Sequence, residues 1–379
     1  MFTRKIVKQK QTTKYTIKEI FADNWQKFLN ANSNLNIRST VYKNVNKILK
    51  CQTADLGFTT FICEKCNILK YVFHTCKSRF CNSCGIKYAK ERATAICAKC
   101  INCRHRHLIF TIPKELRIYF LKDRYLLNIL FDAVGKTILS YFHDMNKSQS
   151  FKPGIICVLH TFGRDMKWNP HIHALCTEGG LGNTEVFRHV RYFDYTALRK
   201  RFQTILLNML EDNLGKNNFR ALKNKIYANT KNGFYVRAKP GNSSRNIKEG
   251  IKYIVRYTGR PVMAQSRILN YDGDNVTFYY ERHEDGKRVE ETIHVFDFIK
   301  RLIIHIPETD FKMIRYYGIY TSHKHKFYDK MIRMFNKNHI KMQKITNRWQ
   351  LSIMADFNRN PLVCDNCNTK MELLEHHFP

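Results

Sequence analysis

The chain has 379 residues, with 65 lysines and arginines against 31 aspartates and glutamates, so its formal charge at pH 7 is +34. Hydrophobic residues make up 44% and aromatic residues 13%, enough apolar material for two or three domains with cores of their own. Self-repulsion at this charge destabilises a compact protein unless a polyanion binds to it, so the composition favours a nucleic-acid-binding protein. The composition argues against a small-molecule metabolic enzyme and against a secreted acid-binding domain.

Membrane insertion and export are not expected from the sequence. No stretch approaches the roughly 18 apolar residues of a membrane helix, and the first five residues, MFTRK, do not resemble a signal peptide. In a reducing compartment, clustered cysteines bind metal more often than they form disulfides, and this chain has 13 cysteines. We therefore expect a cytoplasmic, nucleoid-associated protein with no membrane partner.

The spacing of apolar residues predicts the elements in chain order. Two packed helices are expected at 17–29 and 37–49, followed by a cysteine-rich segment at 51–103. Strands are expected at 107–112, 154–162, 171–176 and 235–238, and helices at 114–146, 195–212 and 246–257. Two hairpins should turn at Asp272-Gly273 and Asp285-Gly286, and a basic, mostly helical tail should run from 321 to 350.

Two Cys-x-x-Cys pairs, Cys63/Cys66 and Cys81/Cys84, are separated by 14 residues. Each pair can hold a zinc ion from one side, and two pairs complete the four thiolates of a tetrahedral site. We therefore predict one structural zinc ion shared by these four cysteines.

Other cysteines and histidines leave the number of zinc ions open. Cys51, His74 and Cys76 could hold a second ion, with a fourth ligand from residue 97, 100 or 103, or these three last cysteines could be buried thiols on a helix. A final pair, Cys364/Cys367, could form half of another site that His376 or His377 would close. Lys77 and Arg79 lie beside the cysteine pairs, where we predict contact with DNA.

A histidine pair and a tyrosine pair are the candidates for catalysis. His171 and His173 alternate on a predicted strand, so both imidazoles should share one face and could chelate a divalent ion. Tyr253 and Tyr257 are four residues apart on a predicted helix, so both phenols should project from one side. A phenol can attack a phosphodiester whose oxygen is held by a metal ion. Either pair alone would more often be part of a protein core.

In combination, four blocks of the sequence resemble the two-tyrosine HUH rolling-circle transposases of bacterial insertion sequences. The cysteine-rich block at 51–84 is similar to the N-terminal transposase zinc-binding domain of that family. The block at 160–181, with HTFG, NPHIHAL and GGL, resembles the family's His-hydrophobe-His region. The block at 253–268, with YIVRYTGR and SRI, is similar to its tyrosine helix, and FIKR with IRYYG at 298–318 resembles its downstream block.

The resemblance implies an α+β fold, in which a central antiparallel sheet of the HUH endonuclease type is flanked by helices and preceded by helical and zinc-binding modules. It implies that His171 and His173 bind a catalytic Mg²⁺ or Mn²⁺ ion and that Tyr253 and Tyr257 are nucleophiles. The third metal ligand is His160, if that residue does not have a conformational role instead, or Gln265. Arginines around the tyrosines would grip DNA phosphates: Arg256, Arg260 and Arg267.

The resemblance also implies four units. These are a helical segment at 1–50, a zinc-binding DNA-recognition domain at 51–105, a catalytic domain at 106–320 and a basic C-terminal region at 321–379.

The expected activity is nicking and rejoining of single-stranded DNA at insertion-sequence ends and targets through a 5′-phosphotyrosine, with a helicase or replication machinery supplied by the host. The alternatives are a non-catalytic, zinc-dependent DNA-binding protein (a decayed transposase) and a rolling-circle plasmid replication initiator or relaxase.

Overall fold

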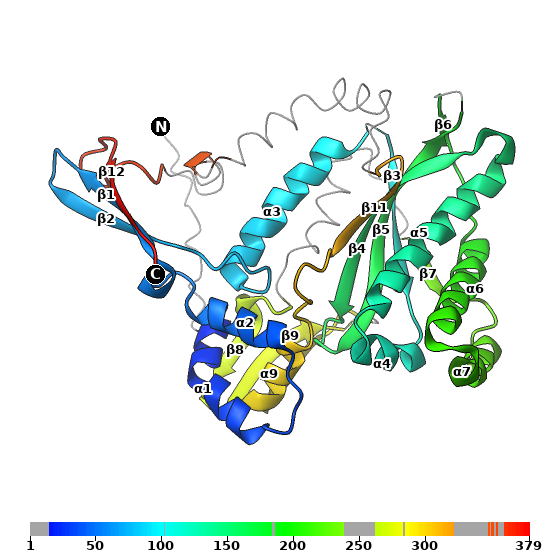
Figure 1. Cartoon of the computed structure of the whole chain (residues 1–379), viewed down its shortest axis with the longest axis horizontal. Coiled ribbons are helices and arrows are strands. Elements are labelled where there is room, and N and C mark those ends of the chain that lie inside the picture. Colours follow the sequence, from blue (N-terminus) through cyan, green and yellow to red (C-terminus); the bar gives the residue numbers. More distant parts are fainter. Residues whose placement is uncertain are drawn as a thin grey trace.

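The computed structural model describes residues 15–101, 103–183, 186–238, 262–282, 285–321, 348, 350–351, 354 and 360–379. Within these residues the chain has the predicted α+β architecture, built from antiparallel sheets and helices. Figure 1 shows a central sheet between helices, a second sheet beside the N-terminal helices, and a small third sheet that stands apart.

The central sheet contains six antiparallel strands. Their order is β11 (Ile314–Gly318), β4 (Lys152–Phe162), β5 (Trp168–Leu181), β3 (His105–Thr111) and β7 (Tyr235–Ala238), and β6 (Phe187–His189) pairs with the far end of β5. The four strands predicted for this region are confirmed, although β5 is longer at both ends than the apolar run that predicted it. The two long strands β4 and β5 form the centre of the sheet, and β5 carries the predicted histidine pair.

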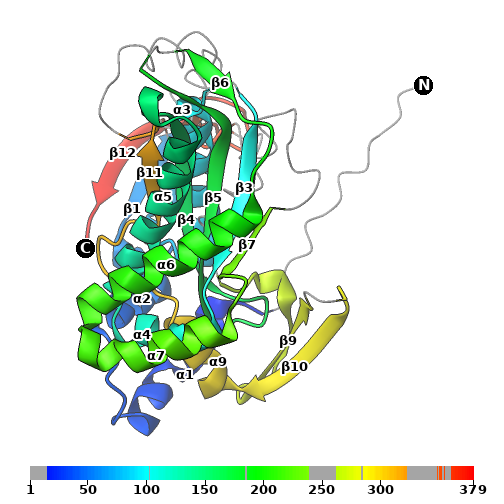
Figure 2. The same cartoon turned by 90° about the vertical axis from the view of Figure 1, so that its right-hand side faces the viewer.

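Helices cover both faces of this sheet. The helices α5 (Leu126–Met145), α6 (Tyr195–Leu214) and α7 (Lys216–Asn229) lie on one side (Figure 2). There α5 packs over β4, in a core that includes Ile155, Cys157 and Leu159, and α6 packs against α5 and β7. The helix α3 (Asn82–Lys99) lies on the other side (Figure 1), where its last turn packs on Ile156 and Val158. In the part of the chain that the structure describes, no helix is both long enough and apolar enough to span a membrane.

The segment 114–146 is helical, as predicted, but it is not one continuous helix. The segment forms two helices, α4 (Lys114–Lys122) and α5, because the backbone at Asp123 is extended and its carboxylate accepts a hydrogen bond from the Tyr125 amide at 2.8 Å. This local bond competes with a continuous helix. The helix α7 was not predicted; Gly215, with φ 86°, separates it from α6.

The two predicted N-terminal helices are confirmed as α1 (Ile17–Ala31) and α2 (Ser39–Leu49). Thr16 and Glu19 form a capping box that fixes the start of α1. These helices share a core with β8 (Ile268–Tyr271), β9 (Asn275–Glu281), β10 (Arg288–His294) and α9 (Val295–Ile303). Both predicted hairpins lie in this sheet, with Gly273 (φ 102°) and Gly286 (φ 71°) at the turns. The same core therefore joins residues from three of the four predicted units, whose boundaries stay a prediction.

The third sheet joins the cysteine-rich segment to the last residues of the chain. Its order is β12 (Glu372–His377), β1 (Phe58–Cys63) and β2 (Ile68–Phe73), all antiparallel. The sequence predicted none of these strands, because they are short and lack a continuous apolar face. The chain end thus lies beside residues more than 300 positions earlier, as the pairing of His377 with Phe58 shows.

Candidate functional site

Three histidines converge on the face of the central sheet opposite α5 and α6. Ile172 and Ala174 of β5 pack into the helical core, so the alternating His171 and His173 point to the other face, as predicted. On β4, His160 lies directly opposite His171. The ring centroid of His160 lies 5.3 Å from that of His171 and 4.3 Å from that of His173. The ring centroids of His171 and His173 are 4.9 Å apart.

The geometry of this group suits a metal ion. One ring nitrogen from each histidine lies within 4.8 Å of the other two. The Nδ1 atom of His171 donates a hydrogen bond to the Asn169 carbonyl at 2.7 Å, which leaves its Nε2 lone pair for a ligand. Burial lowers the pKa of His171 to about 4, so the ring is neutral at neutral pH, as a metal ligand must be.

His107 on β3 extends this group and was not predicted. Its Nε2 atom lies 2.8 Å from Nδ1 of His173, and the two rings are nearly parallel. A hydrogen bond at Nδ1 directs the Nε2 atom of His173 toward the other two rings. The signal was present in the strand HRHLIF at 105–110, because the alternation that pairs His171 with His173 also places His105 and His107 on the same face.

We expect the protein to lose stability in mild acid because of two further buried histidines. Burial lowers the pKa of His105 to about 4 and that of His305 to about 3, against 6.5 for a free histidine. Between these values the unfolded chain binds protons that the folded chain does not, so the free energy of unfolding falls as the pH drops below 6.5. Each histidine contributes about 1.4 kcal/mol per pH unit. Urea titrations at pH 7, 6 and 5 measure this slope; a free energy independent of pH would contradict it.

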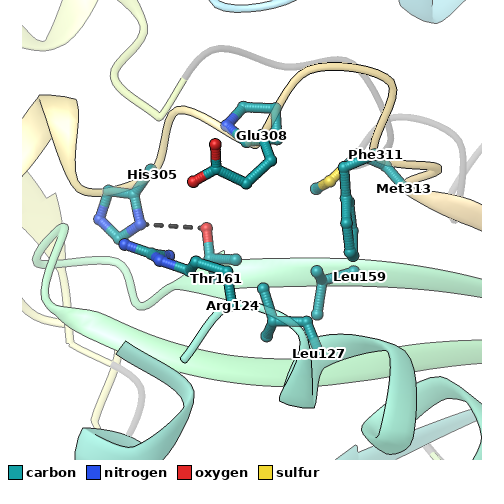
Figure 3. Close-up of a pocket in the computed structure, with 9 residues that line it drawn as sticks. Arg124, Leu127, Leu159, Thr161, His305, Glu308, Phe311 and Met313 are labelled. Atoms are coloured by element: carbon teal, nitrogen blue, oxygen red, sulfur yellow. Dashed lines mark hydrogen bonds between the residues drawn. The ribbon is translucent and has the colours of Figure 1, made fainter. Parts of the chain in front are cut away.

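A small hollow links the histidine strands to the N-terminal core. Thr161 follows His160 on β4, and its hydroxyl lies 3.0 Å from Nδ1 of His305 (Figure 3). The Nε2 atom of His305 lies 2.8 Å from the Met166 carbonyl. The Arg124 guanidinium lines the same hollow, donates to the Ile304 carbonyl at 2.8 Å and lies over the Trp168 ring. These contacts hold the start of β5 against the end of α9. We therefore interpret the hollow as a structural junction.

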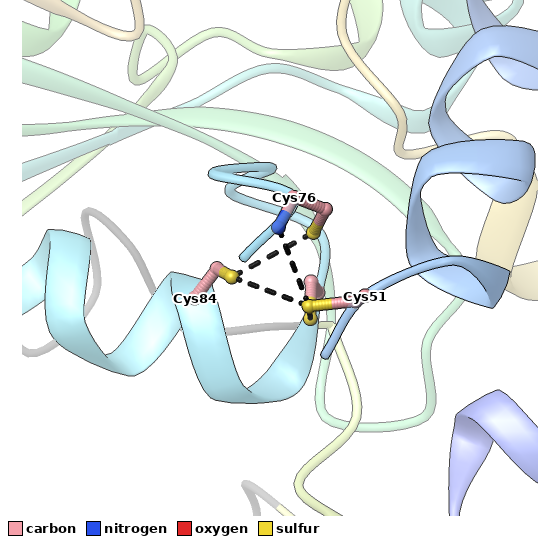
Figure 4. A group of neighbouring side chains, drawn as sticks. Cys51, Cys76 and Cys84 are labelled. Carbon is pink, nitrogen blue, oxygen red and sulfur yellow. Dashed lines mark hydrogen bonds between the residues drawn. The ribbon is translucent and has the colours of Figure 1, made fainter. Parts of the chain in front are cut away.

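Four cysteines converge at the start of α3, but they are not the four that were predicted. Sulfur atoms of Cys51, Cys76, Cys81 and Cys84 all lie within 4.8 Å of one another, and those of Cys51, Cys76 and Cys84 face each other in Figure 4. The sulfur-to-sulfur distances are 3.7 Å for Cys51–Cys84, 3.6 Å for Cys76–Cys84 and 3.8 Å for Cys51–Cys81. Zinc–sulfur bonds of about 2.3 Å in a tetrahedron would separate the sulfurs by about 3.8 Å. The donor set and its spacing therefore fit a zinc ion.

The predicted grouping of the cysteines is therefore corrected. Cys63 and Cys66 do not join Cys81 and Cys84, because they lie at the turn between β1 and β2, away from α3. Their neighbours are instead Cys364 and Cys367. A Cys-x-x-Cys pair specifies two ligands only, and the tertiary structure decides which segment supplies the other two.

The remaining candidates for the zinc sites have other contacts. His74 belongs to neither group: its Nε2 lies 3.1 Å from the Thr59 hydroxyl and its Nδ1 lies 3.1 Å from the Leu56 carbonyl. Cys97 and Cys100 pack in the apolar contact between α3 and the sheet, and Cys103 lies at its margin. His376 contacts the Thr59 hydroxyl at 3.0 Å, so neither that histidine nor His377, which stacks on Phe58, closes the C-terminal pair.

The predicted nucleophiles and two of the predicted DNA-binding arginines lie outside the described residues: Tyr253, Tyr257, Arg256 and Arg260. Arg267 and Gln265 lie in the short helix η3 (Gln265–Arg267), and Gln265 lines a hollow beside Cys51 and Cys81. This position places Gln265 next to the cysteine group, and the third member of the histidine group is His160.

The two basic residues predicted near the cysteines lie beside α3. Arg79 donates to the Phe311 carbonyl at 3.1 Å, and its guanidinium lies 5.7 Å from the centre of the Tyr88 ring. Lys77 follows Cys76 with φ 53° and is exposed. Contact of either side chain with DNA stays a prediction.

Comparisons with known proteins find similar sequences among transposases. A family model described as "Putative transposase" matches residues 154–327, and a model described as "Transposase zinc-binding domain" matches residues 20–112. The chain is 29% identical over 299 residues to the transposase for insertion sequence element IS801 of Pseudomonas savastanoi pv. phaseolicola, covering 74% of this chain and 70% of that protein. The chain is thus similar to insertion-sequence transposases in both of its matched parts.

A second relative within these transposases is the "Putative transposase y4qJ" of Sinorhizobium fredii, 25% identical over 287 residues, or 71% of each chain. No solved structure gives a significant match. The transposase model contains all three converging histidines and both predicted tyrosines. The zinc-binding model contains the whole group at the start of α3, but it ends long before Cys364 and Cys367.

Proposed function

We propose that this transposase nicks and rejoins single-stranded DNA at insertion-sequence ends through a 5′-phosphotyrosine intermediate, in rolling-circle-like transposition. The observation that carries the proposal is the convergence of His160, His171 and His173 on one face of the central sheet. Three imidazoles at this spacing are a donor set for a divalent ion with open positions for phosphate and water.

The donor set favours Mn²⁺ over Mg²⁺ among the two ions that the sequence suggested. Mg²⁺ prefers oxygen ligands in a strict octahedron, whereas imidazole nitrogen suits transition metals. When bound, the ion would offset negative charge on a non-bridging phosphate oxygen. The chain's own contribution is to orient two of the imidazoles, His171 through the Asn169 carbonyl and His173 through His107.

The nucleophiles in this proposal are Tyr253 and Tyr257. A deprotonated phenolic oxygen attacks phosphorus, the bond from phosphorus to the 3′ oxygen breaks, and the departing strand leaves as a free 3′-hydroxyl. The reverse attack by a 3′-hydroxyl of another strand releases the tyrosine and seals the new junction, so rejoining needs no nucleotide cofactor. This assignment is supported by the resemblance and by the transposase model that spans both residues.

We infer the DNA partner from the charge of the chain. A formal charge of +34 favours a phosphate backbone as partner, with binding that weakens steeply as salt rises. The relatives are named as transposases, which act on DNA, and we extend that substrate to single strands at element ends and targets. Strand separation would then be supplied by a host helicase or by replication, in the cytoplasm at the nucleoid.

The proposal is tested with purified protein and end-labelled DNA that carries the element's own ends. Wild-type protein with Mn²⁺ should cleave the single strand, leave the duplex intact and give an adduct that survives denaturation. Tyr253→Phe with Tyr257→Phe should bind the DNA and form no adduct. Binding without cleavage by wild-type protein under Mn²⁺ and Mg²⁺ would favour the non-catalytic DNA-binding protein; cleavage by the double variant would remove the tyrosines from the mechanism.

A further inference from the structure

A second group of four cysteines lies where the turn between β1 and β2 meets the segment that precedes β12. The sulfur atoms of Cys63, Cys66, Cys364 and Cys367 all lie within 4.8 Å of one another. Cys63 and Cys367 are 3.4 Å apart through space and 304 positions apart in sequence. This distance is far beyond the roughly 2.05 Å of a disulfide.

The two cysteine pairs sit in turns of the same shape. Both have the sequence Cys-x-x-Cys-Asn, and both asparagines have a left-handed backbone, with φ 52° at Asn67 and φ 57° at Asn368. Asparagine tolerates this conformation better than other residues with a side chain, except aspartate. Cys63 pairs with Ile68 across the first turn, and the Cys364 amide donates to the Thr369 carbonyl at 2.9 Å across the second. Two segments that are distant in sequence thus present the same pair of thiols to each other.

The sheet that carries these turns has little else to stabilise it. Every residue of β12 is exposed, and so are most residues of β2. The buried core consists of Phe61, Met371 and two of the cysteines. A three-stranded sheet with so small an apolar core is marginal in water, and small modules of this kind depend on metals or disulfides.

We propose that Cys63, Cys66, Cys364 and Cys367 bind a second structural zinc ion, which fastens the C-terminal strand β12 to the hairpin β1–β2. The first zinc ion then belongs to the family's zinc-binding domain, whereas the second needs two ligands from outside the matched range. Lys70 supports the same closure, since its ammonium lies 3.6 Å from the Asp365 carboxylate between the two tail cysteines.

This closure ties the basic C-terminal region at both ends. At its start, the Tyr320 hydroxyl lies 2.6 Å from Nε2 of His105 and accepts a hydrogen bond from the Ile101 amide. At its end, the cysteine pair of the tail would be fixed to the hairpin. These two points flank the basic residues that the sequence predicts to bind DNA.

The test counts zinc ions in full-length protein by mass spectrometry. All proteins carry His171→Ala and His173→Ala, so that an ion bound by the histidines does not enter the count. We expect two zinc ions per chain without further change. Cys364→Ser with Cys367→Ser should leave one, Cys63→Ser with Cys66→Ser should leave one, and all four changes together should also leave one. Cys103→Ser, outside both groups, should leave two.

The decisive result is that each double change and the fourfold change all remove the same single zinc ion. Two cysteine pairs that bind one shared ion cannot release two ions when both pairs are changed. One zinc ion per chain before any cysteine is changed would overturn the proposal, and so would losses that add when the pairs are combined. Limited proteolysis gives a second readout: in Cys364→Ser with Cys367→Ser, residues 360–379 should be cleaved at least tenfold faster, while the thermal unfolding of the central sheet stays unchanged. Equal cleavage rates would show that no zinc ion holds the tail.

Discussion

Replacing His171 or His173 by alanine should reduce DNA cleavage about 10³-fold without weakening DNA binding. Each imidazole would supply one bond to an ion that offsets charge only as the phosphodiester reacts, so its loss raises the barrier rather than the dissociation constant. A factor of 10³ corresponds to about 4 kcal/mol of transition-state stabilisation. Single-turnover cleavage of labelled single strands, beside filter binding of the same DNA, measures both quantities.

The matched control is His143→Ala, which makes the same change at a half-exposed histidine at the end of α5. It should leave cleavage unchanged. His160→Ala separates the two roles that the sequence left open for this residue. If His160 is a ligand, the Mn²⁺ concentration for half-maximal cleavage should rise at least tenfold; an unchanged metal requirement with slower cleavage would assign it a conformational role.

Replacing Cys81 and Cys84 together by serine should unfold the N-terminal core of the protein. These residues belong to the same apolar cluster as α1, α2, α9 and the sheet β8–β10, so the ion they would hold anchors more than the start of α3. Structural zinc in small domains contributes roughly 10–16 kcal/mol, which is as large as the whole stability of a typical domain. Thermal unfolding followed by circular dichroism should show a separate low-temperature transition or its complete loss.

Cys103→Ser is the matched control for this prediction too, because Cys103 belongs to neither cysteine group. Its unfolding curve should follow that of the wild type. If the double serine variant also unfolds like the wild type and keeps its full zinc content, the group at the start of α3 does not bind structural zinc.

The local parts of the fold could be predicted from sequence. Alternation along one strand places His171 and His173 on a common face, and apolar spacing located α1, α2 and four of the six strands of the central sheet. The pairing of His160 with His171 could not be derived in this way, since it depends on the register between β4 and β5. The break at Asp123 was missed because apolar spacing continues on both sides of it.

The zinc ligands show the limit of sequence spacing most clearly. Cys63/Cys66 and Cys81/Cys84 are near in sequence, but a hairpin turn holds one pair and a helix start holds the other. Cys364 and Cys367 reach the first pair only because β12 pairs with β1. The strand β12 has no buried residue, so no apolar pattern could have predicted it. In both groups, long-range strand or helix packing selects the partners.

The most direct measurement is to locate the covalent DNA adduct by peptide mass spectrometry. Wild-type protein is incubated with single-stranded element ends and Mn²⁺, digested with nuclease and protease, and searched for a peptide that carries a 5′-phosphonucleotide. We expect the modification on Tyr253 or Tyr257, and none in protein that carries His171→Ala with His173→Ala. Cleavage of the strand with no modified tyrosine, or with the nucleotide on a residue outside this pair, would contradict it.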